Sequence, residues 1–163
     1  MMIQIRHASD SDAVWLTRLL SDPRFYLRMG YDPEAKDVLR LAVAKKFELY
    51  KDGLGCILIA QHGLVSLGYG AYFHSRSPGY AYIEYGVTPT HFGRGIGGRM
   101  LDALIASAKA NDAQGLQTVC HPRNVASVAL LESRHFIRCK KLSRASWVFD
   151  RYKLSFPIRA WLG

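Results

Sequence analysis

The stretch Val87–Met100 (VTPTHFGRGIGGRM) limits the folds open to this chain more than any other segment. Four glycines and two arginines fall within the seven residues from Gly93 to Arg99. A strand-like run precedes them, and apolar residues at helical spacing follow them. Glycine lets another group approach the main chain closely, and the first N–H groups of a helix lack an intrahelical acceptor. The stretch therefore predicts an anion site at a helix N-terminus, of a kind that fits a pyrophosphate.

Hydrophobic periodicity in the rest of the chain predicts a mixed sheet with helices on both faces. Strands are expected at 2–7, 54–60, 65–73, 80–87, 116–121, 136–140 and 146–156, the last two as a hairpin. Helices are expected from Ser9 to about Leu20, from Pro33 to about Tyr50, from about Arg94 to about Asn111, and at 124–134. This order predicts one α/β (α+β) domain over residues 1–163, with a twisted, mostly antiparallel sheet of about seven strands.

The charge of the chain is positive and uneven. The net charge is +9, and eight Lys/Arg lie between Arg134 and Arg159 against the single acidic residue Asp150. Two interpretations remain open for this basic C-terminal segment: a solvated face, or a surface that binds an anionic partner. The anionic partner would be a phosphorylated cofactor, an acidic peptide or a nucleic acid.

Other features of the composition restrict the class of protein. No run approaches the ~20 apolar residues of a membrane span, so no membrane association is expected. The three cysteines are widely spaced, which argues against a disulfide framework and fits a reducing, cytoplasmic location. The histidines and cysteines show no metal-ligand spacing, and no metal is predicted.

The glycine spacing also fits the dinucleotide fingerprint G-x-G-x-x-G at Gly93, Gly95 and Gly98. Three observations oppose that interpretation. The spacer 88–92 is long for the tight turn of that fold, and the preceding strands form a meander instead of a βαβ unit. No Asp or Glu follows the next strand at Cys120-His121-Pro122 to hold a ribose. A P-loop is excluded because no Gly-Lys-Ser/Thr follows the glycines.

Two segments together resemble the GNAT superfamily of N-acetyltransferases. Val87-Thr88-Pro89 and Gly93-Arg94-Gly95-Ile96-Gly97 are similar to the family's coenzyme A loop, Gln/Arg-x-x-Gly-x-Gly/Ala. The segment 124–132 (NVASVALLE), followed by His135-Phe136, is similar to its Asn-x-x-Ala/Ser-x-x-Leu-Tyr/Leu-Glu-x-x-Gly-Phe pattern. The chain departs from these patterns at Phe92, where Gln or Arg is usual, at His135, where Gly is usual, and at Leu131, where many members carry the tyrosine that protonates the leaving thiolate. The serine-containing form resembles the branch that acetylates the N-termini of ribosomal proteins.

The resemblance implies that acetyl-CoA is the acetyl donor and that an amine attacks its thioester directly. Asn124 would bind the pantetheine arm, and the backbone N–H of Val87 would polarise the carbonyl, where the strand is implied to splay. Ser127 would act as the acid, and Glu84, alone in an otherwise uncharged strand, is the candidate base. The residues expected to bind the cofactor are Val87, Phe92, Gly93, Arg94, Gly95, Ile96, Gly97, Gly98, Arg99 and Asn124.

The expected acceptor is a primary amine, either a protein N-terminus or a small molecule. An α-amine of pKa ~8 is about one-tenth neutral at pH 7, whereas a lysine amine of pKa ~10.4 is almost fully protonated, so a base matters less for N-termini. Two other functions stay open: a catalytically weak module that binds CoA or nucleic acid, and an NAD-type oxidoreductase. The apolar segment 156–162 either covers the core or meets a second subunit in a homodimer.

Overall fold

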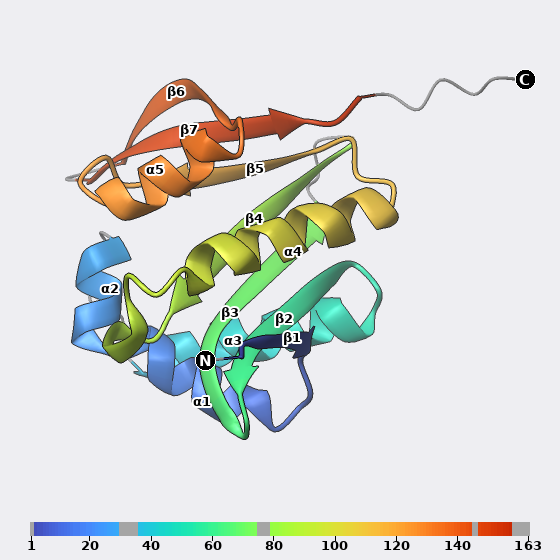
Figure 1. Cartoon of the computed structure of the whole chain (residues 1–163), viewed down its shortest axis with the longest axis vertical. Coiled ribbons are helices and arrows are strands. Elements are labelled where there is room, and N and C mark those ends of the chain that lie inside the picture. Colours follow the sequence, from blue (N-terminus) through green and yellow to red (C-terminus); the bar gives the residue numbers. More distant parts are fainter. Residues whose placement is uncertain (1, 30–35, 75–78, 145–146, 158–163) are drawn as a thin grey trace, which may run out of the picture.

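The computed structural model describes residues 2–29, 36–74, 79–144 and 147–157 (Figure 1). Its centre is a seven-stranded sheet of order β1-β2-β3-β4-β5-β7-β6. Every neighbouring pair is antiparallel except β4 and β5, which are parallel. The mixed, mostly antiparallel sheet that the sequence predicts is confirmed. The strands are β1 (Gln4–His7), β2 (Gly55–His62), β3 (Val65–His74), β4 (Tyr80–Val87), β5 (Gly115–Cys120), β6 (Ile137–Arg144) and β7 (Trp147–Ser155).

Helices cover both faces of this sheet. Helix α4 crosses one face, and α1 and α3 lie on the other (Figure 1). The described helices are α1 (Asp12–Leu20), α2 (Pro23–Met29), α3 (Lys36–Lys51), α4 (Ile96–Ala110) and α5 (Val125–Ser133), with a 3₁₀ turn at Pro89–His91. The parallel β4–α4–β5 connection is the one place where the chain needs a crossover helix, since the other neighbours are antiparallel.

Two hydrophobic cores hold the layers together. Under α4 the core includes Ile83, Met100, Leu101 and Leu104, and on the other face α1 and α3 contribute their own buried residues. Fully burying one such side chain contributes roughly 1.5–3 kcal/mol. Because alternate residues of β2 point to opposite cores, its near-continuous apolar sequence reflects a strand covered on both sides.

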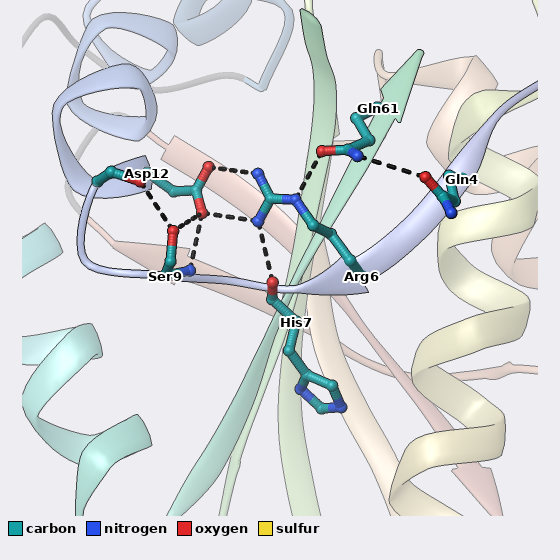
Figure 2. A network of polar contacts seen from close by, with 7 residues as sticks. Gln4, Arg6, His7, Ser9, Asp12 and Gln61 are labelled. Atoms are coloured by element: carbon teal, nitrogen blue, oxygen red, sulfur yellow. Dashed lines mark hydrogen bonds and ion pairs between the residues drawn. The ribbon is translucent and has the colours of Figure 1, made fainter. Parts of the chain in front are cut away.

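A polar network fixes the junction between β1 and α1 (Figure 2). Arg6 donates through Nη1 and Nη2 to the two carboxylate oxygens of Asp12, at 2.8 and 2.9 Å, and through Nε to Gln61 Oε1 at 2.6 Å. Asp12 also accepts from the backbone N–H of Ser9 at 2.8 Å and from its hydroxyl at 3.0 Å. These charge-assisted bonds hold the pKa of the Asp12 carboxyl at about 2, chiefly through Arg6.

One element differs from the expectation. Helix α2 was not predicted, because its seven residues are too few to show helical periodicity. The local signal was Asp22-Pro23: proline suits the first turn of a helix, and Asp22 Oδ1 accepts from the N–H of Arg24 at 2.9 Å. The expected start of the next helix at Pro33 and most of the apolar segment 156–162, from residue 158 on, lie outside the described residues.

None of the helices in the described part of the chain combines the length and apolar character that crossing a membrane requires.

Candidate active site

Strands β4 and β5 separate part of the way along their length. They pair only at Tyr80–Gly115, Ala81–Leu116 and Tyr82–Gln117, after which β4 continues to Val87 beside β3 alone. Thr88 donates its N–H to Leu67 O on β3 at 2.7 Å. Backbone groups alternate in direction along a strand, so the N–H of Val87 is directed away from β3, toward the gap that β5 has left.

The glycine loop borders a cavity of about 500 Å³ at this gap. Gly93 and Gly95 adopt φ values of +75° and +76°, and a Cβ on either one would meet no atom within 4 Å. Gly97 and Gly98 have another role, because a Cβ there would approach Leu130 and Arg134 next to α5. Two glycines thus set the loop conformation, and two allow α4 and α5 to pack closely.

The N-terminus of α4 opens into the same cavity. Gly95 is its N-cap and offers no side-chain acceptor, and the first intrahelical bond there runs from the N–H of Arg99 to Gly95 O. The N–H groups of the first turn therefore have no intrahelical acceptor. Ile96 is buried in the core, so its contribution to the cavity is its backbone. Bare loop backbone, free amides and a helix dipole fit a pyrophosphate group.

Helix α5 supplies the opposite wall of the cavity through Asn124 and Ser127. Asn124 is the N-cap, and its Oδ1 accepts from the N–H of Ser127 at 3.3 Å. Ser127 Oγ lies 2.8 Å from the hydroxyl of Tyr85 on β4. Burial raises the pKa of Tyr85 to about 12, and it also raises the pKa of the Cys120 thiol at the end of β5. Tyr85 is a site residue that the sequence did not single out.

Helix α2 closes one side of the cavity with Phe25 and Arg28, which sequence reasoning also missed. Figure 1 shows α2 beside the loop that precedes α4. The Arg28 guanidinium carbon lies 4.5 Å from the ring centroid of Phe92, which occupies the loop position where the family usually has Gln or Arg. A guanidinium on an aromatic face is a favourable cation–π contact. A positive charge from α2 thus reaches the place where the loop itself lacks one.

The candidate base Glu84 lies elsewhere. It follows Ile83 on β4 and points to the face covered by α3, where Lys46 Nζ contacts its carboxylate at 2.9 Å. Both side chains are 22% exposed, so this ion pair is largely shielded. Glu84 does not line the cavity. Glu84 remains a proposed base, acting either directly or through water.

The remaining predicted residues divide into two groups. The cavity brings together Val87, Phe92, Gly93, Gly95, Ile96, Gly97, Gly98, Asn124 and Ser127. The arginines Arg94 and Arg99 have exposed side chains outside its lining, beside its glycine-rich wall. Within the residues that the structure describes, no cluster of three His, Cys, Asp or Glu is placed to hold a metal ion.

A split parallel pair beside a glycine-rich helix N-terminus, within this strand order, defines an α/β protein whose cavity fits a ligand with a pyrophosphate group. The acetyltransferase (GNAT) domain model matches residues 3–137, so the chain belongs to the GNAT acetyltransferase family. GNAT homologues bind coenzyme A or acetyl-CoA. The NAD-type oxidoreductase left open by the glycine spacing is therefore wrong, since β4 enters the loop from a meander.

Several solved structures share the fold. RimL, a ribosomal L7/L12 alpha-N-protein acetyltransferase in complex with coenzyme A, is 19% identical, with 95% of this chain and 94% of that chain covered and a TM-score of 0.78. YncA from Salmonella typhimurium, a putative acetyltransferase with acetyl-CoA, is 19% identical over 97% and 96%, with a TM-score of 0.79. An N-acetyltransferase from Staphylococcus aureus Mu50 is 22% identical over 95% and 99%, with a TM-score of 0.75. No curated protein matches the chain.

Proposed function

We propose that this enzyme moves the acetyl group of acetyl-CoA to a primary amine by direct attack of the amine on the thioester. The observation that carries the proposal is the divergence of β4 and β5 beside the glycine loop. This divergence supports the proposal because Val87, the N-terminus of α4 and Ser127 border one cavity. Acetyl-CoA would supply an activated carbonyl and a thiolate leaving group.

The residues of the cavity divide the work between binding and chemistry. The loop amides and the α4 N-terminus would bind the pyrophosphate, with Arg94 and Arg99 adding positive charge from outside. Asn124 would bind the pantetheine arm. The Val87 N–H would stabilise charge that develops on the carbonyl oxygen, an interaction worth roughly 2.7–4 kcal/mol when a donor is held in place.

The position of Glu84 bears on the acceptor. A lysine-like amine is almost fully protonated at pH 7 and needs a strong base, whereas about one-tenth of an α-amine of pKa ~8 is already neutral. Glu84 is paired with Lys46 and lies outside the cavity, which fits an α-amine acceptor better than a lysine-like one. We therefore infer that protein N-termini or small amines of low pKa are the acceptors. Solved structures with this fold include RimL and a ribosomal-protein-S5-alanine acetyltransferase from Vibrio fischeri.

An acceptor panel tests the proposal. Thiol release from acetyl-CoA is measured with peptides bearing free N-termini, with the same peptides blocked at the N-terminus but carrying lysine, and with small amines. Turnover with free N-termini or small amines, and little with the blocked peptides, is the expected result. Thermal stabilisation by CoA without turnover on any acceptor would instead favour a CoA-binding module, and no stabilisation by CoA would overturn the proposal.

A further inference from the structure

Tyr85 and Ser127 form a hydroxyl pair between β4 and α5 inside the cavity. Their oxygens are 2.8 Å apart, and both residues line the cavity together with Val87 and Asn124. Tyr85 lies two residues before Val87, so its side chain is on the same face of β4 as that of Val87. The pair is therefore next to the gap into which the Val87 amide is directed.

The position at which many family members carry the proton-donating tyrosine is Leu131 in this chain. Leu131 is fully buried and belongs to the core under α4, and its side chain has no proton to give. A serine hydroxyl alone is a weak acid for a departing thiolate. The neighbouring phenol of Tyr85 is the more acidic of the two hydroxyls, and it remains protonated at neutral pH because burial raises its pKa to about 12.

We propose that Tyr85 is the proton source of the reaction and acts through Ser127. This inference rests on the proposed acetyl transfer. As the carbon–sulfur bond breaks, the Ser127 O–H gives its proton to the thiolate and Ser127 Oγ takes the proton of the Tyr85 hydroxyl. The products are the CoA thiol, an intact serine and a tyrosine phenolate. The phenolate regains a proton from water or from the nitrogen of the attacking amine, which becomes positively charged on attack and must lose a proton to give the amide.

The contact between the two oxygens allows a relay in this direction, because either hydroxyl can be the donor. A hydroxyl that accepts a hydrogen bond becomes a better donor of its own proton, and such chains strengthen in a poorly solvated site. The N-cap bond from the Ser127 N–H to Asn124 Oδ1 holds the serine main chain in place. Of the charged and titratable groups that act on Tyr85, Arg134 favours its ionised form and Cys120 opposes it. The Arg134 guanidinium is itself paired with Asp102, at 3.0 and 3.1 Å. In this relay Ser127 would contact the sulfur, and Tyr85 would act only through Ser127.

The chain contains a matched control for this pair. Tyr80, on the same strand, lies 2.6 Å from Ser155 Oγ on β7 and does not line the cavity. Tyr80→Phe therefore removes the same phenol from the same kind of Tyr–Ser pair, away from the site. Any general effect of losing a tyrosine hydroxyl from β4 appears in both Tyr85→Phe and Tyr80→Phe.

The first measurement needs no acceptor. CoA labelled with ¹³C at the carbon beside sulfur is bound to each variant, and its chemical shift is followed as pH rises through ionisation of the thiol. A hydroxyl pair that donates to sulfur favours the thiolate, so Tyr85→Phe is expected to raise the pKa of the bound thiol relative to wild type and Tyr80→Phe to leave it unchanged. Equal titration in wild type and Tyr85→Phe overturns the relay.

The second measurement is single-turnover acetyl transfer with two donors. With acetyl-CoA, Tyr85→Phe and Ser127→Ala are each expected to slow transfer ~10²-fold, and the double variant is expected to be no slower than either. With the selenoester analogue of acetyl-CoA, whose selenolate leaves without a proton, both defects are expected to shrink markedly. Equal losses with both donors would show a structural role and overturn the relay.

The two proposals fail in distinguishable ways. If wild type does not bind CoA, the labelled ligand reports no bound thiol and the acetyl-transfer function fails together with the relay. If wild type binds CoA and transfers acetyl groups while Tyr85→Phe behaves as Tyr80→Phe does, only the relay fails.

Discussion

The Arg6–Asp12 pair makes a quantitative prediction for Asp12→Asn. This substitution keeps the size of the side chain and removes its charge, leaving the Arg6 guanidinium without its bidentate partner. Asp12 is 5% exposed, so water replaces the lost bonds poorly. We expect the variant to fold, with a lower free energy of unfolding at neutral pH and a weaker connection between β1 and α1.

The pKa of Asp12 sets the size of this effect. The carboxyl has its pKa lowered from 3.8 to about 2 in the folded chain, and at about 1.4 kcal/mol per pKa unit this corresponds to roughly 2–3 kcal/mol of stability. The Arg6 side chain is 35% exposed, so solvent weakens the attraction and we expect about 1–2 kcal/mol. A carboxyl with a lowered folded pKa stabilises the fold above its unfolded pKa. That contribution is lost as pH falls from about 4 to about 2.

Urea unfolding at pH 7, 5, 4 and 3 measures the prediction. The difference in free energy of unfolding between wild type and Asp12→Asn is expected to be constant from pH 7 to 5 and to become smaller below pH 4. Asp10→Asn is the matched control, because Asp10 pairs with Lys51 at the surface, where both side chains are more than half exposed. Its effect should be smaller, below about 1 kcal/mol. If Asp12→Asn lowered the free energy of unfolding only as much as Asp10→Asn, or by an amount that did not change with pH, the proposed stabilisation by the Arg6–Asp12 pair would be refuted.

Three further predictions concern the cavity and its supports. Glu84→Gln is expected to reduce turnover on peptide N-termini by less than about 10-fold; a loss of 100-fold or more in kcat would show that Glu84 is an essential base. Arg28→Gln is expected to weaken CoA binding roughly 10-fold in calorimetry, as loss of one charge-assisted contact does, and a change confined to the acceptor KM would contradict it. Gly86→Ala places a Cβ against the Phe25 ring, too close for the two to fit without movement, and is expected to destabilise the fold by about 1–3 kcal/mol in urea unfolding; unchanged stability would show that α2 moves freely.

Much of the fold could be predicted because its elements carry periodic patterns. β4 begins and ends where alternation and the glycine loop placed it, and α4 begins at Ile96, after the left-handed Gly95. The loop and Asn124 could be found because backbone amides at a helix terminus depend on local sequence. Such features can be predicted from the sequence without knowing which strands become neighbours in the sheet.

The rest of the site depends on contacts between distant segments. Tyr85 was one of several tyrosines in a strand until α5 brought Ser127 to 2.8 Å. Glu84 stands out in the sequence as a lone carboxylate, and only the packing of α3 shows that it is paired with Lys46. The position of Arg28 over Phe92 depends on α2, too short to be recognised by periodicity. In each case the deciding partner lies at least 38 residues away in the sequence.

The split between β4 and β5 explains why these features meet at one place. Beyond Tyr82 and Gln117, β4 remains paired to β3 while β5 remains paired to β7, so each strand stays supported on its outer side as the two diverge. A strand edge with unpaired amides is costly when buried without a partner. Here a ligand can provide that partner, and the loop and α5 enclose the gap from two sides. The separation of the strands thus leaves the N–H of Val87 directed into the cavity. Tyr85 lies two residues earlier on β4, so its side chain is on the same face of the strand as that of Val87, next to α5.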